Sequence, residues 1–307
     1  MKYVSNVREA FVSRTLPTAL TFLENLDTAV ALSVAILVRD GSDDSWDQIY
    51  DKSVSPLNYC DYDYDLFSRD YTAAKLLSKS PNFLGRDLEL MAQESFLKAE
   101  DQCRMVNRQV LSGELSFLLR DNDLPSLTTI KHKVSKVLGR APSPEAVLAC
   151  GGWGPGSSYA LSSHKASPEL KCEYENTVTI GLLRLLQHCE MPRWFNKGFQ
   201  LVPGNLVTTV PKNGKTDRTI AIEPGLNSFF QKGIGHKMRR RLRRFGINLN
   251  DQSINQAGAM LAQDLGYSTL DLKAASDSIS LLLCEAIIPS DWMRLITASR
   301  SERGTFA

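Results

Sequence analysis

Apolar residues recur every three or four positions in several stretches of the chain, which is the period of an amphipathic helix. This pattern predicts helices over Leu84–Leu111 and Leu127–Leu138, and one long helix from Leu226 to Phe245. The apolar run Leu26–Val38 predicts a buried helix, because it is far shorter than the ~20 residues that a membrane span needs. Residues 1–125 are therefore expected to form a mostly helical region.

Short runs rich in β-branched residues follow a different pattern, which is typical of strands. Val207–Val210 and Arg218–Ile222 are two such runs, and a turn-forming segment, Pro211–Asp217, joins them. We therefore expect a β-hairpin with a basic tip.

A third run of this kind, Ser268–Leu272, precedes an acidic turn and an apolar stretch over Ser278–Ile287. The pattern predicts a strand that leads through the turn into a helix, with Ser276 or Asp277 as the helix N-cap. Helices and strands together predict an α+β fold.

The glycine-rich segment Gly151–Ser158 lacks the Lys-Ser/Thr pair of a P-loop and the spacing of a dinucleotide-binding fingerprint. Neither nucleotide-binding motif therefore applies. The composition of the segment predicts a flexible turn.

Charge is segregated along the chain, although the net charge is only +2. Residues 40–74 contain nine aspartates against Lys52 and Arg69, and include the tyrosine-rich patch 59–65, which is expected to be a loop. In residues 191–244 the sign reverses, with twelve lysines and arginines against Asp217 and Glu223. A basic block of this kind attracts polyanions such as nucleic acids or triphosphates, whereas the acidic segment is interpreted as solvated surface.

Cysteine usage and the N-terminus indicate the cell compartment. Six cysteines are scattered without a C-x-x-C pair, which argues against a zinc knuckle and a disulfide framework and favours reduced thiols. The first residues show no apolar segment typical of a signal peptide, so we expect no export.

Two elements carry candidate chemistry for nucleotidyl transfer. Lys212, Lys215 and Arg218 on the hairpin can neutralise the roughly four negative charges of a nucleoside triphosphate. Asp271, on the predicted strand, is placed to bind a metal ion, and Asp277 follows six residues later. Each element alone also fits a simpler interpretation, a solvated basic turn for the hairpin and a helix cap for Asp277. Their occurrence in one chain favours the chemical interpretation.

The residues of these elements resemble polymerase motifs of one family. Val210–Gly225 resembles motif F as the replicases of single-stranded RNA phages carry it, Gly246–Gln256 continues the likeness, and Asp271–Ser280 resembles motif A. The likeness runs in register from about Val207 to Trp292. The chain is therefore identified as similar to the RNA-directed RNA polymerase subunits of levivirus-type phages.

This resemblance implies roles for individual residues. Asp271 would be the catalytic metal ligand, together with the carbonyl oxygen of Leu272, for two Mg²⁺ ions or alternatively Mn²⁺. Ser276 and Asp277 would lie near the ribose 2′-hydroxyl, which distinguishes ribonucleotides from deoxyribonucleotides. The three hairpin cations would bind the triphosphate.

RNA contact is expected at two further places. The arginine-rich face of the long helix, with Arg239, Arg240 and Arg243, has three interpretations: solvated surface, contact with a partner protein, or contact with the RNA backbone. The neighbouring basic hairpin favours the RNA backbone. The resemblance adds Lys165, which follows the glycine-rich segment, as a contact to template RNA.

The resemblance implies a right-hand polymerase. We expect a helical N-terminal region (1–125), fingers with the basic hairpin and helix (126–260), and the first part of the palm (261–307). The sequence contains no Gly-Asp-Asp motif C and no serine- and glycine-bearing motif B after Asp277, so the segment is expected to be inactive alone.

The function implied is RNA-templated RNA synthesis from nucleoside triphosphates to replicate a viral genome, in the cytoplasm of a bacterial host. The family's recruited partners are the host elongation factors Tu and Ts and, in some members, ribosomal protein S1; no membrane is implied. Two alternatives stay open, a non-catalytic RNA-binding protein and a reverse transcriptase, although the residues of motif F disfavour the second.

Overall fold

A computed structural model describes most of the chain, in two compact units. One unit consists of Met1–Ser95 with Thr209–Thr219, and the other of Phe96–Thr208 with Ile220–Ala307. The described residues within them are 14–59, 63–80, 87–162, 166–174, 176–191, 198–267 and 274–306.

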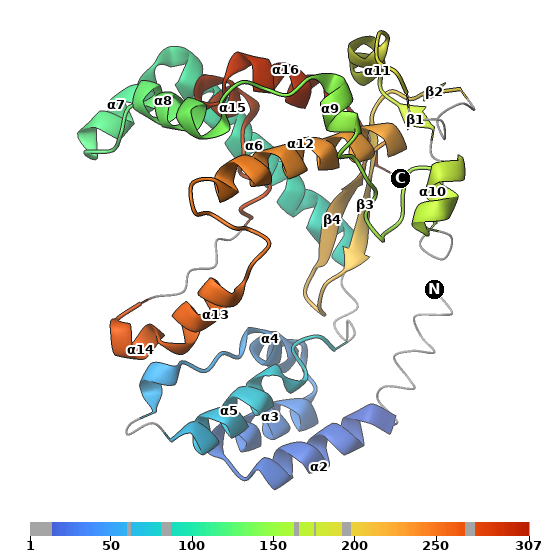
Figure 1. Ribbon diagram of the computed structural model, residues 1–307. Coiled ribbons are helices and arrows are strands. Elements are labelled where there is room, and N and C mark those ends of the chain that lie inside the picture. Colours follow the sequence, from blue (N-terminus) through green and yellow to red (C-terminus); the bar gives the residue numbers. More distant parts are fainter. Residues whose placement is uncertain are drawn as a thin grey trace. The chain divides into compact units, whose positions relative to one another are not determined.

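The first unit is a cluster of helices, shown in blue tones in Figure 1. Its elements are α2 (Leu16–Leu26), α3 (Ala29–Asp40), α4 (Asp43–Asp51), the short 3₁₀ helix η2 (Pro56–Asn58), α5 (Tyr64–Leu76) and the start of α6 (Leu88–Ser112). Apolar side chains from α2, α3, α4 and α5 form one core, which contains Leu23, Val34, Trp46, Ile49 and Ala73. The described part of residues 14–95 is thus mostly helical, whereas the predicted boundary of the N-terminal region at residue 125 stays a prediction.

Two boundaries in this unit differ from the predictions. The buried helix predicted over Leu26–Val38 is confirmed from Ala29 onward, but its start is wrong. α2 ends at Leu26, and Thr28 starts α3 as an N-cap by accepting a 3.1 Å hydrogen bond from the Ala31 N–H. In the tyrosine-rich patch, Asp63 caps α5 by accepting from the Leu66 N–H at 2.9 Å, so part of the predicted loop is helical. Both differences arise because a Thr or Asp side chain satisfies a free N–H at a helix start.

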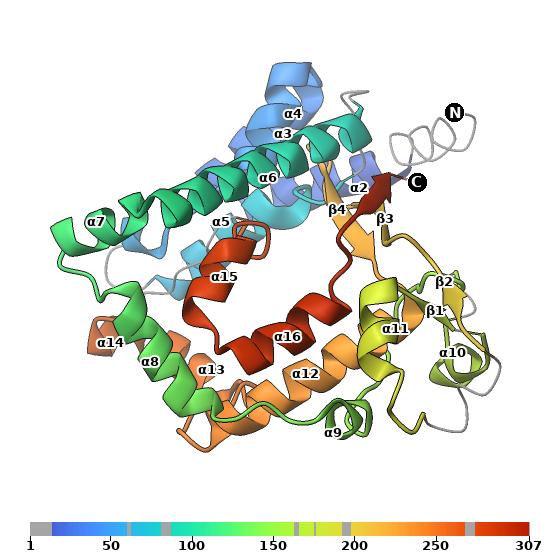
Figure 2. The same cartoon turned by 90° about the horizontal axis from the view of Figure 1, so that it is seen from above.

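The second unit is built around the long helix α12 (Gly225–Arg243). Figures 1 and 2 show α12 beside α9 (Pro144–Leu148) and α16 (Ser290–Ser299), and it also contacts α8 (Leu127–Leu138). Its buried face, with Leu226, Phe230 and Ile234, packs in a core that includes Leu182 and Trp292. The predicted helices at α8 and α12, and at α6, are confirmed. The unit's remaining helices are α7 (Glu114–Asp121), α10 (Pro168–Tyr174), α11 (Ile180–Leu186), α13 (Ser253–Met260), α14 (Ala262–Leu265) and α15 (Leu281–Ile287).

A buried amide fixes the start of α12 in this core. Asn227 is fully buried, and its side-chain oxygen accepts from the Thr179 N–H at 3.0 Å. Its amide nitrogen donates to the Thr179 hydroxyl at 2.7 Å and to the Ser299 carbonyl at 2.8 Å. Because both N–H groups and the oxygen have partners, the burial of this polar side chain costs little and orients α12 against α11 and α16.

Strands among the described residues form two small sheets. β1 (Thr177–Val178) pairs in parallel with β2 (Gln200–Leu201). β3 (Asn205–Pro211) lies between β4 (Asp217–Ile222) and β5 (Gly304–Phe306), with β3 parallel to β5. The predicted hairpin strands are therefore confirmed, whereas the predicted strand Ser268–Leu272 lies outside the described residues. A mostly helical chain with few strands is compatible with the α+β prediction.

Candidate nucleic-acid interface

The basic hairpin has a tightly closed tip. The side-chain oxygen of Asn213 accepts from the backbone N–H groups of both Lys215 and Thr216 at 3.0 Å, an arrangement that lets asparagine mimic one arm of a turn. Lys212 and Arg218 flank this turn and are exposed to solvent. The predicted turn is confirmed, and two of its three cations are accessible to a charged ligand.

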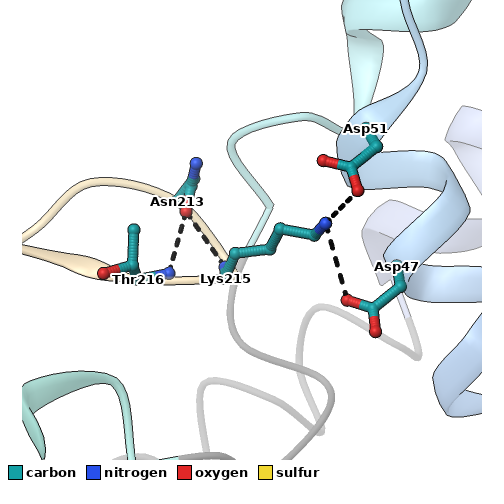
Figure 3. A network of polar contacts seen from close by, with 5 residues as sticks. All are labelled: Asp47, Asp51, Asn213, Lys215 and Thr216. Carbon is teal, nitrogen blue, oxygen red and sulfur yellow. Dashed lines mark hydrogen bonds and ion pairs between the residues drawn. The ribbon is translucent and has the colours of Figure 1, made fainter. Parts of the chain in front are cut away.

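Lys215 behaves differently from the other two cations. Its Nζ forms ion pairs with Asp51 and, at 3.8 Å, with Asp47, both on α4 (Figure 3). Beside it, Gly214 lies against Tyr50 so closely that an added Cβ would come within 2.1 Å of the tyrosine hydroxyl. The ion pairs of Lys215 and the close packing of Gly214 against Tyr50 therefore hold the tip on α4.

The outgoing strand of the hairpin is held in the same unit. The Thr219 hydroxyl donates to the Ala92 carbonyl of α6 at 3.1 Å. Burial raises the pKa of the Asp217 carboxyl above its ordinary value of 3.8, and the nearby Asp87 raises it further. The folded protein therefore holds the Asp217 proton more tightly than the unfolded chain does.

Glu223 anchors the chain where the hairpin leads into α12. Its carboxylate accepts from Asn205 at 2.7 Å, from the Ser301 hydroxyl at 2.8 Å and from Gln231 at 3.3 Å. Three neutral donors thus stabilise the charge. The base of the hairpin and the start of α12 are joined by this network.

The solvent-facing side of α12 forms a cationic groove of about 550 Å³. Arg239, Arg240 and Arg243 are brought together here, at helical spacing, and Arg239 donates to the Asn250 side chain at 3.1 Å. The other lining residues among those that the structure describes are Lys232, Gly235, His236, Asn248, Leu249 and Asn250, so no described lining residue carries a carboxylate. Such a surface favours a phosphate backbone, because the fixed planar guanidinium groups match phosphate oxygens.

The predicted ribose contacts lie in a turn before α15. Ser276 and Asp277 are exposed, and the Ser276 hydroxyl is 3.0 Å from an Asp277 carboxylate oxygen. The N–H groups of Asp277 and Ser278 both donate to the Ala274 carbonyl, and Ala274 has a φ of 54°. The predicted helix Ser278–Ile287 is therefore wrong at its start: α15 begins at Leu281 after Ser280, and neither Ser276 nor Asp277 caps it, because this turn holds both residues outside the helix.

Helix α6 supports this turn from one side. The Cys103 thiol donates to the Asp277 carbonyl at 3.2 Å, and burial, together with Glu100 and Asp277, raises the pKa of the thiol. One turn further along α6, the Asn107 side chain accepts from the Leu282 N–H at 3.0 Å. Asn107 thus caps α15, because the residue at the N-cap position of α15 makes no side-chain capping hydrogen bond.

The glycine-rich segment is held in place by two lysines. The buried ammonium of Lys171 donates to the carbonyls of Gly154 and Gly156 at 2.6 and 2.5 Å. Lys232 donates to the Trp153 carbonyl at 2.7 Å. Trp153–Gly156 forms no helix or strand, as the turn prediction requires, and its carbonyls receive the charge that a buried lysine brings with it.

Three predicted site residues, Asp271, Leu272 and Lys165, lie outside the described residues. Elsewhere in the described ranges, no group of three or more His, Cys, Asp or Glu side chains is placed to hold a metal ion. No helix in those ranges combines enough length and apolarity to cross a membrane. The sequence interpretation missed the contacts of Asp47, Asp51, Lys171 and Asn227, although the opposite charges of segments 40–74 and 191–244 were a signal for the first two.

Comparison with known proteins identifies the family. Residues 36–307 match the family described as RNA replicase, beta-chain. The chain is 37% identical over 247 residues to the RNA-directed RNA polymerase subunit beta of Escherichia virus Qbeta, with 78% of this chain and 41% of the relative covered. It is 38% identical over 256 residues to the subunit of Enterobacteria phage SP, with 80% and 43% covered.

A relative from Enterobacteria phage fr, an RNA-directed RNA polymerase beta chain, is 33% identical over 260 residues, with 78% of this chain and 47% of the relative covered. The chain thus spans less than half the length of these curated relatives. The match extends from α3 to the end of the chain and includes the hairpin, the groove and the turn before α15. This chain belongs to the RNA replicase beta-chain family of RNA phages.

Proposed function

We propose that this chain forms part of an RNA-directed RNA polymerase that replicates a viral RNA genome. The observation that carries the proposal is the family match over residues 36–307, which contains both cationic elements and the turn with Ser276 and Asp277. The right-hand arrangement, with regions 1–125, 126–260 and 261–307 as N-terminal region, fingers and start of the palm, is part of the proposal.

The hairpin is proposed to bind the incoming nucleoside triphosphate. Lys212 and Arg218 are exposed on either side of the closed turn, and Lys215 lies between them. Cations held on a rigid turn neutralise the charge of the phosphates without a large loss of side-chain freedom. Arg218 can grip two phosphate oxygens at once, whereas the lysines act as point charges.

The groove on α12 is proposed to bind the RNA backbone. Its arginines, with Lys232, face a space of about 550 Å³, and none of the described residues that line it carries an opposing carboxylate. Phosphate contacts of this kind carry no base sequence, which suits a polymerase that must move along its template. Lys165 is proposed as a further template contact.

The turn before α15 is proposed to select the sugar. The Ser276 hydroxyl and the Asp277 carboxylate are exposed and adjacent. An acceptor at this place can bind a ribose 2′-hydroxyl, which a deoxyribose lacks. The hydrogen bond from Cys103 of α6 to the Asp277 carbonyl supports the backbone of this turn.

Asp271 and the Leu272 carbonyl are proposed as ligands of a divalent cation, with Mg²⁺ as the ion and Mn²⁺ as its alternative. The basis of this assignment is the resemblance of Asp271–Ser280 to motif A, since no metal-binding group of side chains occurs within the described residues. When bound, such ions would activate the attacking hydroxyl and neutralise the departing pyrophosphate.

The host elongation factors Tu and Ts, and ribosomal protein S1, are proposed partners, with the bacterial cytoplasm as the place of action. The basis is the family alone. Copurification of the tagged subunit from infected cells would test each of them.

The first test is Asp271→Asn in an active replicase subunit that contains this chain. Loss of the carboxylate is expected to lower template-directed nucleotide incorporation by about a thousandfold or more, while RNA binding stays unchanged. Incorporation at the wild-type rate would contradict the proposed metal ligand. Loss of RNA binding along with activity would instead show that the substitution disrupts the fold.

The second test concerns the triphosphate. Lys212→Ala and Arg218→Ala are each expected to raise the KM for nucleoside triphosphates about tenfold, because each removes one charged contact. Lys98→Ala, an equal loss of charge at an exposed position on α6, is the control and should leave the KM unchanged. A KM unchanged in both Lys212→Ala and Arg218→Ala would refute the role of the hairpin.

A further inference from the structure

The acidic segment 40–74 has a defined structural relation to the basic hairpin. Of its nine aspartates, Asp47 and Asp51 are four residues apart on α4, so both lie on one face of the helix. That face meets the hairpin tip, where both carboxylates pair with Lys215 (Figure 3). These aspartates therefore differ from a solvated acidic surface.

The pair is asymmetric. Asp47 and Lys215 are largely covered, with side-chain exposures of 33% and 25%, whereas Asp51 is 74% exposed. Asp47 lies 3.8 Å from Nζ, beyond hydrogen-bond range, and Asp51 accepts a hydrogen bond. A lysine ammonium has three N–H donors, so among the described residues two of them are left for another acceptor.

The helix that carries these carboxylates is rigidly held. Ser42 caps α4 by accepting from the Ser45 N–H at 3.2 Å, and Trp46 and Ile49 are buried in the core of the first unit. Tyr50, also buried, fills the space that a side chain at position 214 would need. The carboxylates thus have a fixed place relative to the hairpin tip.

We propose that Asp47 and Asp51 are positioning residues that hold the Lys215 ammonium in place for the triphosphate. This inference rests on the proposed function of the hairpin. A lysine has a long flexible stem whose freedom must be lost when it binds phosphate. The two carboxylates restrict the lysine side chain before the ligand binds and leave N–H groups of the ammonium available for phosphate. In protein kinases, a glutamate pairs in the same way with the phosphate-binding lysine.

The opposite role would be a lock, in which the carboxylates compete with the triphosphate for Lys215. The two carboxylates together carry more negative charge than the ammonium carries positive charge, so they also repel an anionic ligand. The exposure of Asp51 to water and salt weakens this repulsion, and the single hydrogen bond leaves most of the ammonium's donors available. Positioning is therefore favoured, and the two roles predict opposite changes in the KM.

The test measures KM and kcat for nucleoside triphosphates, and template affinity, in an active replicase subunit that contains this chain. Asp51→Asn and the double variant Asp47→Asn/Asp51→Asn are expected to raise the KM about three- to fivefold, the range for a partly exposed ion pair, with kcat and template affinity unchanged. Asp44→Asn is the matched control, since Asp44 is on the same helix but bonds to Gln48. In a Lys215→Ala background, the two aspartate substitutions should have no further effect, because their target is gone.

The possible outcomes distinguish the positioning role of the two aspartates from the proposed binding of triphosphate by Lys215. A KM that falls in the aspartate variants overturns positioning in favour of the lock. An unchanged KM in those variants, with a raised KM in Lys215→Ala, overturns positioning and leaves the function of the hairpin intact. An unchanged KM in Lys215→Ala overturns the triphosphate role of Lys215 itself. Equal thermal unfolding of Asp51→Asn and wild type excludes misfolding as a cause, and Asp51→Glu should restore the wild-type KM.

Discussion

The two cationic regions of this chain, the hairpin tip and the groove on α12, use the same side chains in different ways. At the tip, Lys215 is paired with two carboxylates and its neighbour Gly214 is packed against Tyr50. In the groove, Arg239, Arg240 and Arg243 line an open space in which no carboxylate from the described part of the chain opposes them. The tip therefore presents a small number of oriented charges, and the groove presents a broad field.

This difference teaches what each region can recognise. An oriented charge suits a ligand with a fixed reactive geometry, such as a triphosphate that must lie in line for displacement. A broad field suits a repeating polyanion that slides, because its affinity comes from counterion release and depends on salt rather than on exact placement. The comparison can be tested by changing one region at a time.

The largest expected effect is on the groove. Replacing Arg239, Arg240 and Arg243 together by alanine should weaken RNA binding at low salt by about a hundredfold. It should also reduce the slope of log affinity against log salt by roughly 2–3, since about one counterion is released per phosphate contact. Filter binding or fluorescence anisotropy over a salt series gives both values.

The control for the groove is Arg244→Ala, an exposed arginine of the same run that does not line the groove. A salt slope unchanged in the triple variant would contradict the assignment of the groove to the RNA backbone. A raised KM for triphosphates in that variant would remove the distinction between the two regions.

A smaller effect, on the free energy of unfolding, is expected when either of two glycines is replaced by alanine. Gly214→Ala should destabilise the protein by about 1–3 kcal/mol, because its methyl group would overlap Tyr50. Gly235→Ala, in the exposed face of α12 with no atom within 4 Å of the new Cβ, should instead stabilise by up to about 1 kcal/mol. Chemical denaturation measures both; equal effects would show that the tip is not docked more tightly than the groove.

The smallest effect concerns pH at the hairpin. Burial, followed by Asp87, raises the pKa of Asp217, so the folded state binds this proton more tightly than the unfolded state, and stability falls as pH rises from about the ordinary value of 3.8. Asp217→Asn should therefore stabilise at pH 7 by roughly a few tenths of a kcal/mol, because the side chain is partly exposed and solvent screens it. Denaturation at pH 7 and pH 3 provides the check, and a gain that persists at pH 3 would point to another cause.

Local patterns predicted the elements that depend on local physics. The helices at α6, α8 and α12 and the hairpin strands followed from apolar spacing and turn residues, because each such element buries one face or closes on itself. Helix starts were less predictable where several cap residues lie close together. Ser276, Asp277 and Ser280 all suit an N-cap. The turn after Ala274 leaves Ser280 at the N-cap position, but Asn107 of α6 makes the capping hydrogen bond.

In the candidate site, too, some features followed from the sequence and others only from the tertiary structure. The sequence alone identified Lys212, Lys215 and Arg218 as a basic turn and grouped the arginines of α12 on one face, since both conclusions need only residue spacing. Only the tertiary structure paired Lys215 with α4, more than 160 positions away, and buried Asn227 and Lys171 against backbone groups of distant segments. The sequence shows which kinds of partner a charged or amide side chain can bind. It does not show which partner the side chain meets, because that depends on how the apolar faces of distant segments pack together.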